Sequence, residues 1–362
     1  MTLAHGQRAI SIFLACGPRS PARPQSFRRF RGILVMNLSL LVRKYRSIII
    51  QSRMSPISRS AALLTFALVA IGLICSIATK FTFTSLPNIL PLVGYVLVLD
   101  ILSQLAPQTR IVEAARTLLF GALYLIITIL CGVFAAYAMQ RLAFPLQDQL
   151  LANVDMALGL TWSDFAHWVD RHPFVQTIFH SAYDTIKLQI ALPLVVLACT
   201  NRLTEVRSYL LAFAIAFTLT IVVSALLPAA GPIVFVDRTD FSILHFTGAT
   251  PLDHLMRLRE AGLLVMSNPP GGIATFPSFH ATVAVLTPLT LRGYRPIFAA
   301  LLFLNAAMLA ATVTEGAHYF IDVIAGSGMA FFAYALAKRI IRLEDRSSDR
   351  RRSQPVGHPS PC

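Results

Sequence analysis

Long charge-free apolar stretches recur along the chain and predict helices that cross a membrane. A bilayer helix needs about 20 apolar residues, and most of the stretches approach that length. Eight stretches fit this description: residues 60–79, 81–99, 117–140, 175–200, 208–229, 278–291, 296–314 and 316–337. The pattern predicts an all-α polytopic integral membrane bundle of about eight transmembrane helices.

Three of these stretches are less regular than the others. The second contains Pro87 and Pro91, which predict a kinked or tilted helix. The fourth is charge-free only from Leu188, and the sixth is short. We therefore expect the true number of spans to be eight, with one more or one fewer as the margin.

The composition agrees with a membrane protein and excludes several other classes. Of the 362 residues, 56% are hydrophobic and 13% are charged, whereas an ordinary soluble domain carries about 25% charged residues. Mean hydropathy is +0.65. A water-soluble globule cannot hide that much apolar surface, so a soluble enzyme, a disordered chain and a disulfide scaffold are excluded.

The excess positive charge lies in the two tails. Of the 31 Lys and Arg residues, 11 precede residue 60 and seven follow residue 337, and the first acidic residue is Asp100. Basic tails are typical of cytoplasmic ends that face anionic lipid. The net charge of +14 therefore favours a membrane partner over nucleic acid.

The sidedness of the spans follows from the same charges. With the N-terminus inside, 24 of the 31 Lys and Arg residues fall on the inner side, as the positive-inside rule requires. Both termini are then cytoplasmic. The outer face would be periplasmic in a bacterial inner membrane and lumenal in a Golgi-type membrane of a eukaryote.

Two long connections lie on the predicted outer side. Residues 141–174 mix aromatic and acidic residues, which predicts amphipathic helices on the membrane interface. Residues 230–275 are rich in Pro and Gly and end in a strong breaker, Asn268-Pro269-Pro270-Gly271-Gly272. Long outer loops beside short inner ones place the function on the outer face.

The chain divides into four parts on this reading. They are a basic cytoplasmic tail (1–59), N-terminal transmembrane helices with an outer interfacial segment (60–174), a catalytic transmembrane domain (175–337) and a basic cytoplasmic tail (338–362). Residues 1–35 are open to another interpretation, in which they are disordered or translation starts at Met36.

Two of the nine histidines stand out by their positions. His280 and His318 are 38 residues apart, and the chain between them crosses the membrane twice. Both therefore lie at the outer ends of helices, at similar depth. Asp322 follows His318 by four residues, which puts the two side chains on one helical face.

The residues around the histidines suit a phosphate site. Pro277 is favourable in the first turn of a helix and leaves the amides of Ser278 and its neighbours unpaired for an anion. Asp322 can accept one ring N–H of His318 and leave the other nitrogen free as a nucleophile. A carboxylate at this depth is costly without a partner, which favours a functional role.

Together, residues 276–280 (Phe-Pro-Ser-Phe-His) and 318–322 (His-Tyr-Phe-Ile-Asp) resemble the motifs of the phosphatidic acid phosphatase type 2 (PAP2) superfamily. The similarity covers mainly residues 180–337. It is closer to the inositolphosphotransferase branch, typified by inositol phosphorylceramide synthase, than to soluble acid phosphatases. The resemblance implies a PAP2-type helical core and a phosphohistidine mechanism without a metal or other cofactor.

The resemblance also implies a role for each residue of the pair of motifs. His318 would attack phosphorus and Asp322 would orient it. His280 would protonate the departing alkoxide and then activate the acceptor. The partners implied are membrane lipids: a phospholipid donor and a lipid or polyol acceptor.

The sequence departs from the superfamily at its positively charged positions. The Lys and Arg-Pro of the first motif are missing near the fourth span, and Ala311 and Thr312 stand where the third motif usually has Ser-Arg. A phosphoryl transition state needs positive charge on its oxygens. The substrate phosphate-binding residues we expect instead are Ser278, Lys187, Arg238, Arg257 and Tyr183.

The sequence leaves the activity itself open between alternatives. The first expectation is a lipid phosphotransferase of the inositolphosphotransferase type, and the alternative is a lipid phosphate phosphatase. A further alternative is a non-catalytic transporter or scaffold with the same fold, which the missing arginines favour. The five cysteines show no metal-ligand spacing, and the oligomeric state is not indicated.

Overall fold

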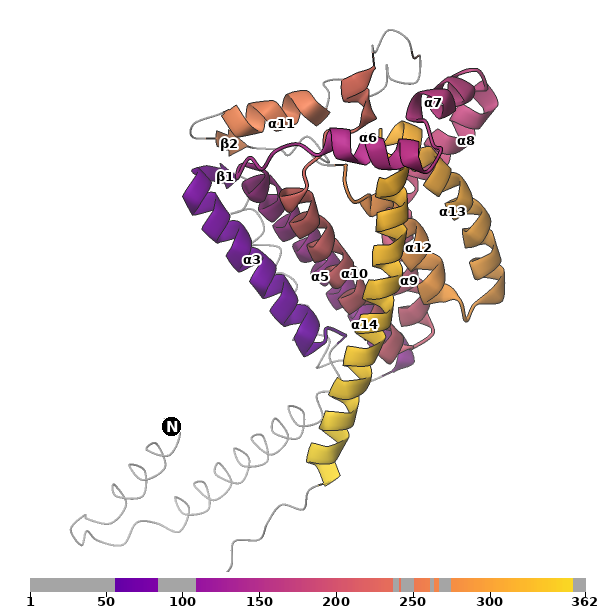
Figure 1. Cartoon of the computed structure of the whole chain (residues 1–362). Coiled ribbons are helices and arrows are strands. Elements are labelled where there is room, and N and C mark those ends of the chain that lie inside the picture. The colour runs from indigo at the N-terminus through magenta and orange to yellow at the C-terminus, as the bar shows by residue number, and fades with distance from the viewer. Residues whose placement is uncertain are drawn as a thin grey trace, which may run out of the picture. The chain divides into compact units, whose positions relative to one another are not determined.

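Helices dominate the residues that the computed structural model describes, which are 56–83, 109–236, 241, 251–260, 264–266 and 275–353. The longer helices (Figure 1) are α3 (Arg59–Thr79), α5 (Arg110–Gln140), α8 (Pro173–Asp184), α9 (Ile186–Cys199), α10 (Leu203–Leu226), α12 (Phe279–Leu291), α13 (Arg295–Glu315) and α14 (Phe320–Ser353). The shorter elements are α6 (Asp148–Ala157), α7 (Trp162–Asp170), the 3-10 helix η2 (Pro232–Phe235), α11 (Pro251–Glu260), β1 (Phe81–Phe83) and β2 (Leu264–Met266).

The predicted all-α fold class is confirmed, apart from one short strand pair. β1 and β2 pair in parallel over three residues each, with Phe81 opposite Leu264. The sequence had given no sign of this pairing, because such short strands leave no alternating pattern to read. The predicted loop over residues 230–275 also contains η2 and α11.

Several helices are long and apolar enough to span a membrane, which suggests an integral membrane protein. Within the described residues there are five (α3, α5, α10, α13 and α14), and six if α8 and α9 together form one bent span. α12 is apolar but has only 13 residues. The predicted count of eight is therefore not confirmed. Most of the predicted span 81–99 lies outside the described residues.

The predicted fourth span, 175–200, consists of two helices rather than one. α8 and α9 meet at an angle of 48°. At the junction, the Thr185 hydroxyl donates to the Ala182 carbonyl at 2.6 Å. A side chain bonded to its own backbone in this way competes with regular helix geometry. The bend places Tyr183, at the end of α8, beside the start of α12.

The outer connection folds into the short helices α6 and α7, and the chain continues into α8 (Figure 1). Apolar side chains of α7 and α8 pack on the segment where α13 ends and α14 begins. Leu151 of α6 packs with Tyr319. The Trp162 indole N–H donates to the Val313 carbonyl at 2.8 Å. Trp168 and Phe174 remain exposed, as expected for helices on a membrane interface.

A cluster of charged residues connects three helices at the end of the bundle where α3 and α10 begin. The Arg207 guanidinium pairs with Glu344 at 2.9 Å and with Asp345. The Ser60 hydroxyl and amide both donate to Glu344. α3, α10 and α14 are thus connected through Glu344, whose partner Arg207 is only 9% exposed.

Replacing Arg207 by methionine should destabilise the bundle, because two carboxylates then lose their buried partner. We expect a loss of about 1–3 kcal/mol, measured as a thermal midpoint at least about 3 °C lower in detergent. Arg202→Met is the control, since Arg202 is 61% exposed and forms only a surface pair with Glu205. Equal midpoints for the two variants would contradict this account.

α12 packs closely on α14 at Gly326. A Cβ atom built on Gly326 would lie 2.2 Å from the Ser278 carbonyl oxygen, and the Thr282 hydroxyl donates to the Gly326 carbonyl at 3.0 Å. Of the two glycines in Gly326-Ser327-Gly328, Gly326 is therefore the one at which the helices pack closely. Gly328 faces open space.

Gly326→Ala should push α12 away from α14, because the atom it would strike is backbone and cannot rotate aside. We expect a cost of about 1–3 kcal/mol, seen as a lower thermal midpoint in detergent. Gly328→Ala is the matched control on the same helix and should be neutral or stabilising by about 0.5–1 kcal/mol. The prediction fails if the alanine is tolerated equally at both positions.

Candidate active site

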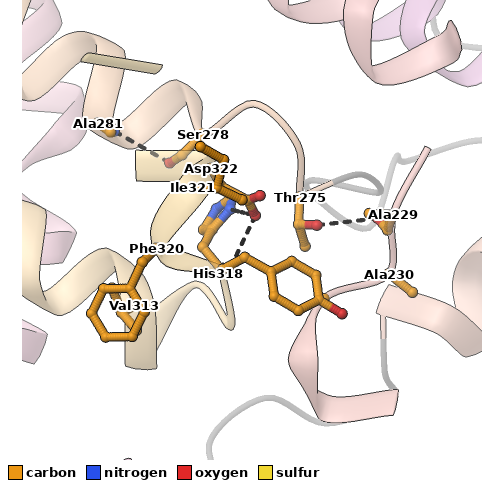
Figure 2. Close-up of polar contacts among 12 residues, drawn as sticks. Ala229, Ala230, Thr275, Ser278, Ala281, Val313, His318, Phe320, Ile321 and Asp322 are labelled. Carbon is orange, nitrogen blue, oxygen red and sulfur yellow. Dashed lines mark hydrogen bonds and ion pairs between the residues drawn. The ribbon is translucent and has the colours of Figure 1, made fainter. Parts of the chain in front are cut away.

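The core of the site is a hydrogen-bonded pair, His318 and Asp322, at the start of α14 (Figure 2). His318 Nδ1 lies 3.0 Å from Asp322 Oδ2. An ionised carboxylate only accepts hydrogen bonds, so Nδ1 carries the proton and Nε2 presents its lone pair. His318 is 7% exposed and Asp322 is fully buried. A buried carboxylate with this partner holds the imidazole in one tautomer and one orientation.

The local backbone explains how these side chains meet. His318 lies in the turn before α14 rather than inside the helix, and Ala317 has a left-handed conformation with φ of 48°. Asp322, in the first turn, also accepts the Tyr319 amide at 3.1 Å. This is half of a capping box, in which the third residue of a helix reaches back to the residue before its start. The same carboxylate therefore both caps α14 and orients the imidazole.

His280 lies in the first turn of α12. Ser278 caps this helix, because its hydroxyl oxygen accepts the Ala281 amide at 3.3 Å. The Ser278 amide donates to the Asp322 backbone carbonyl at 3.1 Å. The two sequence motifs are thus joined directly through Ser278, which is fully buried.

Tyr183 connects the two histidines. Its ring stacks on His280, with ring centroids 3.9 Å apart and an angle of 9° between the planes. A methyl group placed on Gly316 would lie 2.5 Å from His318 Cδ2 and 2.9 Å from Tyr183 Oη. Both side chains therefore border the same small space.

The amides at the start of α12 are partly unpaired, as an anion site requires. Within the described residues, the Phe279 and His280 amides have no hydrogen-bond acceptor. The Ser278 amide, expected to face a phosphate, is instead used by Asp322. The anion-facing donors are therefore one and two residues further along the chain than Ser278.

The expected cations are less closely tied to the histidines. Lys187 lies exposed in the first turn of α9 and forms no ion pair with any of the described residues. Arg257 is exposed on α11, which packs on α5 through Leu258. No hydrogen bond or ion pair connects Arg257 with either histidine in the described part of the chain. Arg238 lies outside the described residues.

Sequence reasoning missed two aspartates next to the site. Asp148 and Asp155 on α6 are buried, and their carboxylates accept hydrogen bonds from residues 230–231 and from residues 319–321, directly after His318. The sequence pattern does not distinguish them from the other acidic residues of the interfacial segment. The available signal was their spacing of seven residues, which places both on one face of a helix.

The comparison with protein families gives a clear result. Residues 149–336, just over half of the chain, match the sequence model of the PAP2 superfamily. The chain belongs to the PAP2 superfamily. The PAP2 match includes α6 from its second residue onward, without Asp148, and both histidine motifs. Searches of curated proteins and of solved structures returned no match.

Membership of the PAP2 superfamily is consistent with a lipid phosphatase or phosphotransferase, since PAP2 proteins generally have these activities. In the part of the PAP2 chain that the structure describes, no three His, Cys, Asp or Glu side chains are grouped so as to hold a metal ion.

Proposed function

We propose that this PAP2 protein is a membrane lipid phosphotransferase of the inositolphosphotransferase type, acting through a covalent phosphohistidine. The observation that carries the proposal is the cluster of His318, Asp322 and His280, joined through Ser278. We place the site on the outer face of the membrane, because the basic residues lie mainly on the other side.

In the first step, His318 Nε2 attacks the phosphorus of a phospholipid headgroup. A phosphorus–nitrogen bond forms, and the bond from phosphorus to one ester oxygen breaks. His280 donates its proton to that oxygen, which leaves as an alcohol. Asp322 stabilises the positive charge that develops on His318.

In the second step, His280 takes the proton of an acceptor hydroxyl. The acceptor oxygen attacks phosphorus, the phosphorus–nitrogen bond breaks, and His318 returns to its starting state. The unpaired amides of Phe279 and His280, together with the exposed Lys187, supply donors and charge to the phosphate oxygens.

One feature favours transfer over hydrolysis. Ala311 and Thr312, where PAP2 phosphatases usually have Ser-Arg, carry no charge. These two positions therefore present no cation to the phosphate, unlike the matching positions of the phosphatases.

The test is turnover by the purified full-length chain in lipid nanodiscs. Each nanodisc carries one phospholipid class with a labelled headgroup phosphate, phosphatidylinositol among them, with ceramide or glycerol as acceptor. We expect the label to move to the acceptor. Release of free headgroup phosphate would identify a hydrolase instead. No turnover with any class, together with lipid movement across vesicles that persists without His280 and His318, would favour the transporter.

A further inference from the structure

The interfacial helix α6 carries two carboxylates that are unusually buried. Asp148 is 6% exposed and Asp155 is 3% exposed. Aspartates on a helix at a membrane surface normally face water, because burying an unpaired carboxylate is costly. The two are seven residues apart and therefore share one face of α6. That face points toward the segments that hold His318.

Asp155 caps α14 from outside the helix. Its carboxylate accepts the Phe320 amide at 2.7 Å and the Ile321 amide at 2.9 Å. These are the first two amides of α14, which otherwise have no partner inside the helix. A negative charge there also interacts favourably with the helix dipole. Burial raises the pKa of the Asp155 carboxyl, and the two amides oppose that rise.

Asp148 holds the segment behind His318. It accepts the Gly231 amide at 2.8 Å, the Ala230 amide at 3.1 Å and the Tyr319 hydroxyl at 3.0 Å. Burial and the nearby charge of Asp148 raise the pKa of Tyr319, so its hydroxyl keeps the proton that it donates. Gly231 in turn packs closely on Ala317: a Cβ atom built on Gly231 would lie 2.3 Å from the Ala317 carbonyl oxygen.

The residues on both sides of His318 in the chain are therefore held in place by contacts that start at α6. Tyr319 is bonded to Asp148, and Phe320 and Ile321 are bonded to Asp155. Ala317 is packed against the segment that Asp148 holds. The Tyr319, Phe320 and Ile321 amides at the start of α14 all donate to carboxylates. By contrast, the Phe279 and His280 amides at the start of α12 have no acceptor among the described residues.

We propose that Asp148 and Asp155 are positioning residues, which hold residues 317–322 so that His318 Nε2 faces a phosphate bound at the start of α12. This inference rests on the proposed phosphotransferase function and assigns α6 a part in it.

The test compares Asp155→Asn with Asp164→Asn in the full-length protein in nanodiscs. Asp164 is an exposed acidic residue of the neighbouring helix α7 and serves as the matched control. We expect Asp155→Asn to lower kcat by about 10- to 100-fold with KM nearly unchanged, since a small misplacement of a reacting group has this effect. In a single turnover, covalent phosphoenzyme should form more slowly by the same factor. Asp164→Asn should match the wild type.

Two outcomes would overturn the inference. One is a kcat for Asp155→Asn within about twofold of the wild type. The other is a loss of activity in Asp155→Asn that disappears once kcat is calculated per folded protein. A role in stability alone predicts that result. If Asp155→Asn does not fold, Tyr319→Phe decides: we expect kcat to fall about 3- to 10-fold, and an unchanged kcat overturns the inference. If the wild type itself shows no turnover, the proposed function fails first.

Discussion

His318→Ala should abolish turnover of the phospholipid donor, with a fall in kcat of at least about 10³-fold. Removing a nucleophile leaves only the contribution of binding and of the phosphate-binding donors. His318 is the histidine whose Nδ1 is held by a buried carboxylate, 3.0 Å away. Its Nε2 is therefore the nitrogen prepared for attack. Steady-state transfer of the labelled headgroup phosphate to the acceptor in nanodiscs measures the loss.

The control for this variant is His172→Ala. His172 is an exposed histidine of the outer segment, and its ring lies against the Trp168 carbonyl and indole. We expect its removal to leave kcat within about twofold of the wild type, as for most surface substitutions. If His318→Ala retained wild-type turnover, the assignment of the nucleophile would be wrong.

His280→Ala should produce a loss that depends on the leaving group. For an alkyl phosphodiester the departing alkoxide needs a proton, and losing a general acid lowers the rate by about 10²- to 10⁴-fold. For an aryl phosphodiester the phenolate leaves without a proton. The burst of phenol release should then fall by less than about tenfold. Rapid-quench measurement of the first turnover with both esters separates the two cases.

His318→Ala is the comparison for this experiment, because a missing nucleophile lowers the rate with both esters. An equal loss with both esters in His280→Ala would contradict the role of general acid. It would indicate that His280 only binds the phosphate. The stacking of Tyr183 on His280, at 3.9 Å, is the same for both substrates and does not account for a difference between them.

The sequence predicted most of the helices and the pairing of the two motifs. Helical spans and the spacing from His318 to Asp322 are local patterns with a fixed period, so they can be read without knowing what packs against them. The predicted contact between these two side chains forms, although His318 lies just outside the helix. The reason is the left-handed turn at Ala317, which no pattern in the sequence announces.

The rest depended on contacts between segments distant in the chain. The sequence predicts solvent-facing acids at Asp148 and Asp155. In the structure these carboxylates are bonded to Tyr319 and Phe320, which are more than 160 residues away in the chain. The sequence likewise predicts an unpaired Ser278 amide, but this amide donates to the Asp322 backbone carbonyl. A backbone hydrogen bond across two helices leaves no trace in the identity of the residues that form it.

The most direct test of the mechanism is to trap the covalent intermediate. The full-length protein is mixed with a donor phospholipid labelled in the headgroup phosphate, quenched in alkali within one turnover, digested and analysed by mass spectrometry. We predict the phosphorylated headgroup on the peptide that contains His318, and its loss when an acceptor alcohol is added before the quench. An adduct on His280, or turnover with no adduct on any histidine, would contradict the mechanism.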